Sequence, residues 1–175
     1  MALDYLMIIP LFLIGSVLHF TYNWSKHNKS VAIISAVNES YWEHIKIAFW
    51  PVFLLYLVEF ALGGYNFSSF IPAKTIALYT IPIAMVAIVF GYKHFAKKNI
   101  LAIDIGAFLI TIAVAQTTSS LLIGQLSASF LTIIVSLCFL AFIIIAFLVS
   151  TKHSPKETDL FKDPVTSKYG LKGHK

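Results

Sequence analysis

Long apolar stretches constrain this chain more than any other feature of its sequence. A helix that crosses the hydrocarbon core of a bilayer needs about 20 apolar residues, because each residue advances it by about 1.5 Å. Three stretches of this length are separated by short polar segments, at residues 3–22, 38–62 and 72–92. Each of them is expected to form one transmembrane helix.

The apolar character then continues almost unbroken over residues 100–150. As a single helix this stretch would be roughly 75 Å long, which is too long for one span and therefore predicts a helical hairpin. A polar turn at residues 124–127 divides the stretch into spans of about 100–122 and 128–150. The sequence thus predicts an all-α integral membrane bundle of about five transmembrane helices in residues 1–150, followed by a polar tail at 151–175.

Composition agrees with a membrane protein and argues against a nucleic-acid partner. The chain is 58% hydrophobic and only 12% charged, whereas soluble domains carry about 25% charged residues. Its net charge of +5 comes from lysines that lie between the apolar stretches and in the tail. That placement is typical of orientation in a bilayer, so the expected partners are the bilayer and a small ligand or ion.

Lysine placement predicts the orientation of the chain. The lysines follow the first span (Lys26, Lys29), the third span (Lys93, Lys97, Lys98) and the fifth span (six more after Ser150). Lys74 is the one lysine expected at the opposite side. Since cytoplasmic segments of membrane proteins carry the excess of lysine and arginine, these two loops and the tail are expected in the cytoplasm, with the N-terminus outside.

The densest polar segment is Asn38-Glu39-Ser40-Tyr41-Trp42-Glu43-His44-Ile45-Lys46, at the expected cytoplasmic start of the second span. If the helix begins at Asn38, a turn of 100° per residue places Glu39, Glu43 and Lys46 on one face. His19, near the end of the first span, is expected at the same depth. The predicted ligand-binding residues are Glu39, Glu43, His44, His19 and Lys46.

The same depth of the bundle holds the residues that a divalent metal would require. His19, His44 and Asp104 are the candidate metal ligands, because imidazole and carboxylate groups bind such ions. A divalent metal is the cofactor that these residues would hold, and the sequence identifies no other.

A structural interpretation of these residues stays open beside the functional one. Acidic residues at helix starts and basic residues at helix ends are favoured by the helix dipole. Asn38 or Ser40 would serve as an N-cap, and Glu43 and Lys46 would pair on the surface at a spacing of three. On the outer side, Glu59 is expected to pair with Lys74 across the 63–71 loop, or else to contribute to a substrate or ion path.

The Asn-Glu-Ser-x-Trp-Glu-His-x-Lys block, together with His19, Trp24-Ser25 and the Asp163–Gly170 segment of the tail, resembles an uncharacterised family of small bacterial multi-pass membrane proteins. The likeness covers nearly the whole chain, but the family pattern has Pro at Ala36 and Gly at Ser167. It implies a bacterial plasma-membrane protein and brings no known activity. Because the tail belongs to the pattern, we expect it to cap the cytoplasmic cluster.

Three functions remain as hypotheses. The preferred one is a binder or carrier of a small ligand or ion that uses the Glu/His cluster. The second is a metal-dependent intramembrane hydrolase, with His19, His44 and Asp104 as metal ligands and Glu43 as general base. The third is a structural subunit of a membrane complex. A close approach of the His19 and His44 rings would favour a metal.

Overall fold

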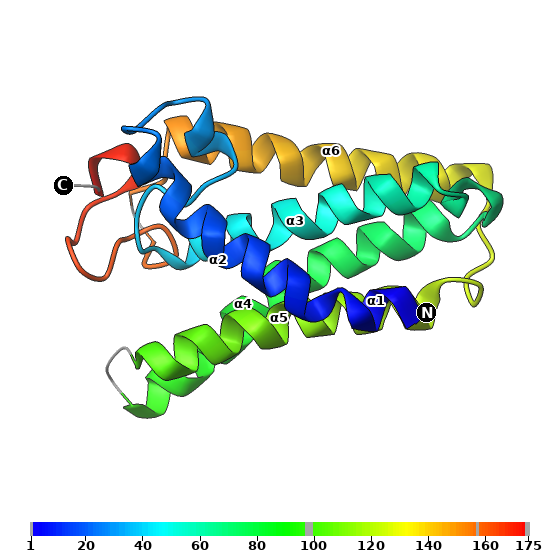
Figure 1. Cartoon of the computed structure of the whole chain (residues 1–175), viewed down its shortest axis with the longest axis horizontal. Coiled ribbons are helices and arrows are strands. Elements are labelled where there is room, and N and C mark those ends of the chain that lie inside the picture. Colours follow the sequence, from blue (N-terminus) through cyan, green and yellow to red (C-terminus); the bar gives the residue numbers. More distant parts are fainter. Residues whose placement is uncertain (1, 97–99, 157, 174–175) are drawn as a thin grey trace.

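The computed structural model describes residues 2–96, 100–156 and 158–173. These residues form six α-helices, most of which run along the long axis of the molecule (Figure 1). The helices are α1 (Ala2–Leu6), α2 (Ile8–Trp24), α3 (Tyr41–Ala61), α4 (Phe70–Ala96), α5 (Leu101–Leu122) and α6 (Phe130–Lys152). Three short 3₁₀ helices are η1 (Val31–Ile33), η2 (Gly64–Asn66) and η3 (Gly170–Gly173). Among the described residues there is no strand beyond one isolated bridge between Lys162 and Tyr169.

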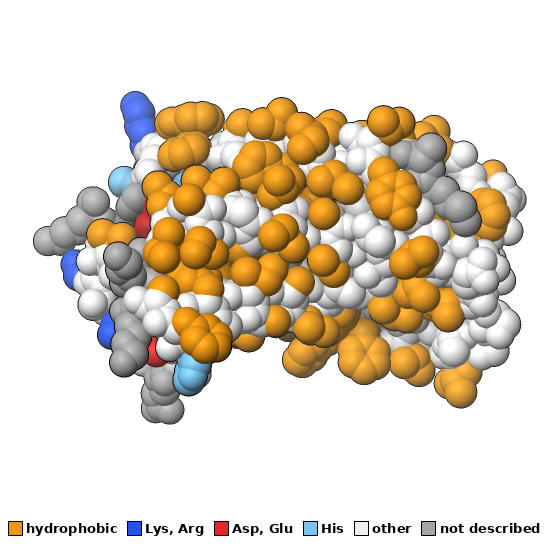
Figure 2. Space-filling view, turned by 90° about the horizontal axis from the view of Figure 1, so that it is seen from below, with side chains coloured by type: hydrophobic (Ala, Val, Ile, Leu, Met, Phe, Trp, Pro, Cys, Tyr) orange, Lys and Arg blue, Asp and Glu red, His pale blue; other side chains and the backbone are white. Residues whose placement is uncertain are grey.

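Helices α3, α4, α5 and α6 are each long and apolar enough to cross a membrane, and α2 is a shorter apolar helix of 17 residues. Hydrophobic side chains cover the length of the bundle, while the charged side chains visible in Figure 2 gather at one end. The predicted fold class, an all-helical membrane bundle, is therefore confirmed.

The predicted first helix is interrupted at Met7, which separates α1 from α2. Pro10 explains the position of the break, because proline has no N–H to donate to the carbonyl of Leu6, four residues earlier. The neighbouring bonds remain, from Met7 N to the Leu3 carbonyl at 3.0 Å and from Leu11 N to the Met7 carbonyl at 2.9 Å. The chain therefore stays hydrogen-bonded across the break, although α2 runs at an angle to α1 (Figure 1).

The other helices lie close to the predicted ranges. Helix α3 begins at residue 41 rather than 38, and α4 continues to residue 96 rather than 92. Helices α5 and α6 differ from their predicted ranges by two residues or fewer at each end, and the expected turn at 124–127 lies between them.

Helix α3 lies at the centre of the bundle and is packed by its neighbours. The ring of Phe49 in α3 packs against that of Phe147 in α6, with centroids 4.9 Å apart and the planes tilted by 51°. On another side, α2 approaches so closely that a Cβ built at Gly15 would lie 2.6 Å from the Phe108 ring and 3.0 Å from the Ile47 carbonyl oxygen. Only glycine allows this crossing, which brings the end of α2 beside the start of α3.

At the end of the bundle that holds α1, Lys74 pairs with Glu59, as predicted. Lys74 Nζ also donates to Asp4 at 3.0 Å and to Ser119 at 2.7 Å, and all three groups are buried. Gln116 Nε2 donates to the Asp4 carbonyl at 3.1 Å. These bonds hold α1 against α4 and α5. That Asp4 takes part in them was not predicted from the sequence.

Candidate metal centre

The polar block begins before α3 rather than inside it. Ser40 occupies the N-cap position with extended backbone angles, and its side chain makes no capping bond. Asn38 Oδ1 instead accepts from Ser40 N at 2.9 Å. The predicted helix start was therefore three residues too early, and Glu39 does not share a helix face with Glu43 and Lys46. Freed from the helix, Glu39 extends toward α2.

His44 lies in the first turn of α3, where its orientation is fixed by the backbone. Its Nδ1 donates to the Ser40 carbonyl at 2.9 Å. A carbonyl oxygen can only accept, so the proton lies on Nδ1 and the lone pair of the neutral ring lies on Nε2. That Nε2 atom is 4.0 Å from Glu39 Oε2. The arrangement is typical of metal-ligating histidines, whose second nitrogen donates to a carbonyl or carboxylate.

His19 in α2 completes the cluster from the other side of Glu39. Its Nε2 lies 3.2 Å from Glu39 Oε2, and its ring centroid is 5.2 Å from that of His44. One ligand atom each from His19, Glu39 and His44 lies within 4.8 Å of the other two. Tetrahedral coordination with bonds of about 2.1 Å needs ligand atoms about 3.4 Å apart, so modest side-chain rotations would complete a metal site.

Asp104, the third predicted metal ligand, lies near this cluster but does not join it. Its Oδ1 accepts a hydrogen bond of 2.5 Å from Tyr92 Oη. Among the described residues, only His19, Glu39 and His44 have ligand atoms close enough to hold one ion. The structure therefore places Glu39 where the sequence suggested Asp104.

Glu43 and Lys46 form a separate ion pair of 2.5 Å that is almost completely buried, with side-chain exposures of 4% and 0%. Glu43 Oε2 accepts from Val37 N at 3.0 Å, and Lys46 Nζ donates to the Ala32 carbonyl at 2.8 Å. The expectation of a surface pair is wrong, because η1 and α6 cover this side of α3. The pair fixes the α2–α3 connection and does not contact His19 or His44 through any of these bonds.

Two cavities meet at the cluster, and they share Glu39, His44, Leu101 and Asp104. The tail cavity has a volume of about 440 Å³, and its other lining residues are Tyr41, Met85, Val89, Pro164 and Val165. The α2–α5 cavity has a volume of about 410 Å³, and its other lining residues are Phe12, Ser16, His19, Phe20, Ile47, Ile105 and Phe108. The His19–Glu39–His44 cluster is thus a group of polar side chains between cavity walls that are mostly apolar.

The tail packs on this end of the bundle, as expected. Asp163 Oδ1 accepts from Val165 N at 2.7 Å and from Thr166 N at 3.0 Å, which folds the segment into a tight turn. Asp163 Oδ2 reaches Glu39 N at 3.4 Å, and Asn38 Nδ2 donates to the Gly170 carbonyl at 3.0 Å. The tail therefore holds the segment that carries Glu39.

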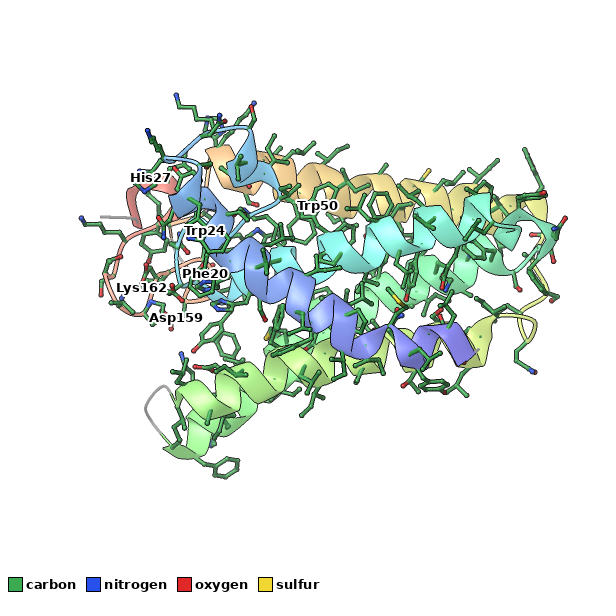
Figure 3. All side chains as sticks on the ribbon, viewed as in Figure 1. Phe20, Trp24, His27, Trp50, Asp159 and Lys162 are labelled. Atoms are coloured by element: carbon green, nitrogen blue, oxygen red, sulfur yellow. The ribbon has the colours of Figure 1, made fainter. Side chains whose placement is uncertain are left out.

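Aromatic side chains surround the same end. The rings of Trp42 and Phe161 are 4.8 Å apart, which anchors the tail to α3. Phe20 and Trp24 stack with centroids 5.9 Å apart at the end of α2, the end at which Figure 3 also shows Asp159 and Lys162 of the tail. Trp50 instead donates to the Ile33 carbonyl at 3.0 Å.

Asp163 is the supporting residue that sequence reasoning missed as part of the site. The signal was present, because an Asp-Pro dipeptide with Thr166 and Ser167 close behind it favours a turn. The turn also includes Ser167 at a φ of +58°, a conformation that glycine adopts without steric cost. That explains why the resembling family pattern has glycine at this position.

A family model described as a family of unknown function, DUF6512, matches residues 3–171. No curated protein and no solved structure matches the chain significantly. The match covers nearly the whole chain, both the helical bundle and the tail, so it applies to the end of the molecule where the cluster lies.

Proposed function

We propose that this chain, which belongs to the DUF6512 family of unknown function, is a membrane-embedded binder of a divalent metal ion and, through that ion, of a small ligand. One observation carries the proposal: ligand atoms of His19, Glu39 and His44 converge within 4.8 Å from two different helices and the segment between them. Groups brought together from separate elements indicate a built site better than neighbours on one helix do.

The donor set indicates the class of ion. Two imidazoles and one carboxylate are the ligands of zinc sites that keep a fourth position open for water or a substrate. The bond from His44 to the Ser40 carbonyl supports this assignment, because it presents the Nε2 lone pair to the cluster. The open position would face the two cavities, so a bound ligand would approach the ion from there.

A metal-dependent hydrolase is the second candidate, and the position of Asp104 favours it. Asp104 lines both cavities beside the cluster, where a carboxylate acts as general base in metal-assisted hydrolysis. Glu43, the base suggested by the sequence, is instead committed to Lys46. A hydrolase would lose turnover in Asp104→Asn while keeping its metal, whereas a binder would show no turnover in either form.

For the orientation in the membrane, we keep the one that the lysine placement indicates. The cluster, the α2–α3 connection and the tail would face the cytoplasm, and α1 would begin on the outer side. We place the protein in the plasma membrane of a bacterium, as the family resemblance implies. Four helices able to cross a membrane support a multi-pass protein.

Metal content of the purified protein tests the proposal. The wild type, purified without chelators, is expected to carry about one zinc or similar ion per chain by mass spectrometry. His19→Ala, His44→Ala and Glu39→Gln are each expected to lower that content at least tenfold, since each removes one of three ligands.

His27→Ala is the matched control. His27 lies at the same end of the bundle and bonds to Asn23 at 3.2 Å, outside the cluster, so its loss should leave the metal content unchanged. Equal metal in the wild type and in His44→Ala would contradict the proposal. So would metal-free wild-type protein that takes up no zinc on titration.

A further inference from the structure

The two cavities at the cluster differ in their walls and in where they open. Phe12, Phe20, Ile105 and Phe108 line the α2–α5 cavity, and the side chains of Phe20 and Ile105 are half exposed on the outside of the bundle. In a helical membrane protein such apolar outer surfaces face acyl chains. The α2–α5 cavity therefore opens toward the bilayer, close to its cytoplasmic boundary under the proposed orientation.

The tail cavity has a more polar surrounding. Tyr41 lines it, and Lys93 Nζ lies 4.3 Å from the centroid of the Tyr41 ring. Pro164 and Val165 of the tail turn form part of the wall of this cavity. A charged or strongly polar group would fit here, between the lysine and the metal centre.

The charge of the side chains around the site indicates which polar group would bind there. The carboxylates of Glu39 and Asp104 line both cavities, and Asp163 of the tail accepts from Glu39 N at 3.4 Å, so the metal-free site is negative even with Lys93 close to Tyr41. A divalent ion on the cluster would offset two of these negative charges and would offer an open coordination position to an anionic oxygen. An anion is then attracted at close range, whereas the metal-free site repels it.

We propose that the metal-loaded site binds an anionic single-chain amphiphile that enters from the bilayer. This inference rests on the proposed metal site. An oxygen of the carboxylate or phosphate headgroup takes the open position on the ion and lies beside Lys93, and the chain occupies the α2–α5 cavity. Each cavity has a volume typical of small-molecule sites, at about 440 and 410 Å³.

The test uses the full-length protein in nanodiscs of zwitterionic lipid, with cis-parinarate, a fluorescent single-chain carboxylate, as the probe. Zinc-loaded protein is expected to bind it saturably, and EDTA is expected to weaken binding at least tenfold because it removes the ion that would hold the headgroup. Oleate should displace the probe. Oleyl alcohol, which has the same chain and no charge, should not.

Two substitutions locate the chain and the headgroup. Ser16→Phe fills the α2–α5 cavity and should weaken probe binding at least tenfold without changing zinc content. Ser136→Phe is its control, because both serines bond a carbonyl four residues earlier and Ser136 lines neither cavity. Lys93→Gln should weaken binding several-fold, and Lys152→Gln, an exposed lysine of α6, should not.

The outcomes separate this inference from the proposed function. Stoichiometric zinc without saturable probe binding overturns the inference and leaves the metal site standing. Probe binding that is equal with and without EDTA also overturns it, as does displacement by oleyl alcohol at the same concentration as oleate. These measurements use the wild type, so they decide the question even if Ser16→Phe fails to fold. Absence of zinc from every sample overturns the proposed function itself.

Discussion

Glu39 and Glu43 are four positions apart and lie in opposite surroundings. The Glu39 side chain is 46% exposed and lies between two histidines. The Glu43 side chain is 4% exposed and pairs with the completely buried Lys46. An exposed carboxylate can be reached by a ligand, whereas a buried one is needed to balance a buried charge.

Glu43→Gln should therefore destabilise the protein strongly. The substitution leaves the Lys46 charge buried without its counter-charge, which typically costs about 3–5 kcal/mol. In metal-free protein, Glu39→Gln should change the free energy of unfolding by less than about 1 kcal/mol, as is usual at exposed positions. Chemical denaturation of the two variants beside the wild type measures the difference.

A double substitution, Glu43→Leu with Lys46→Met, is the control for that prediction. It removes both charges at similar volume and should recover most of the lost stability. If Glu43→Gln alone unfolds at the wild-type denaturant concentration, the Glu43–Lys46 ion pair does not stabilise the fold.

The chemistry of the polar block could be predicted from the sequence, but the roles of its residues could not. Glu39, His44 and His19 were predicted because ionisable groups at one membrane depth are rare and costly. Their separation from Glu43 depends on where α3 begins, and helix starts are uncertain by a few residues in any pattern. Tyr92 bonding to Asp104 depends on tertiary packing, which has no local signal.

At the level of elements, the tail acts as a clamp on the segment before α3. It holds Asn38 through Gly170 and Glu39 through Asp163, and the Trp42 backbone N–H donates to the Leu160 carbonyl at 3.0 Å. These bonds all reach residues within or next to the polar block. The tail is therefore expected to order the cluster as well as to cover it.

Deletion of residues 155–175 should lower both stability and metal affinity. Without the tail, the backbone of Glu39 loses its Asp163 partner and the Trp42 ring loses its contact with Phe161. We expect the thermal midpoint to fall by several degrees and zinc affinity to fall about 10–100-fold, the range seen when supporting groups of a metal site are removed. Thermal unfolding and zinc titration in the same detergent measure both.

Ser167→Gly should act in the opposite direction. Ser167 holds a φ of +58°, which costs a non-glycine residue roughly 1–2 kcal/mol, partly offset by the extra freedom of glycine in the unfolded chain. A small gain in the thermal midpoint is expected, with zinc affinity unchanged or slightly higher. Unchanged stability after deletion of the tail would contradict the clamp, whatever the outcome at Ser167.

Helices were easier to predict than their interruptions and crossings. Apolar length alone located α3 to α6, because the bilayer fixes how long a span must be. The break at Met7 follows from Pro10 by a local rule. The crossing at Gly15 requires knowledge of which helices meet, and a single glycine in an apolar stretch carries no such information.

In the whole molecule, two polar clusters lie at opposite ends of an apolar bundle. Lys74, Glu59 and Asp4 are buried at the end that holds α1. The His19–Glu39–His44 cluster lies at the other end, where the tail and the α2–α3 connection pack together (Figure 1). The first and last elements of the described chain, α1 and η3, therefore lie at opposite ends of the bundle (Figure 1).

This arrangement predicts the topology in the cell. Lys26, Lys29 and Lys93 lie at the cluster end, whereas Lys74 at the other end is neutralised by two carboxylates. Since the excess of lysine stays on the cytoplasmic side, green fluorescent protein fused after residue 175 should fluoresce. Alkaline phosphatase fused after residue 66, in η2, should be active because that loop would face outward.

The reverse fusions provide the control, with alkaline phosphatase after residue 175 inactive and green fluorescent protein after residue 66 dark. Replacing Lys26, Lys29 and Lys93 together by Gln removes three of the eleven lysines in the predicted cytoplasmic loops and tail without touching the His19–Glu39–His44 cluster, and should weaken the preference without reversing it. An active phosphatase at residue 175 in the wild type would invert the proposed orientation. The metal centre and its lipid-facing cavity would then open toward the outer side, and the ligand would have to come from the outer leaflet.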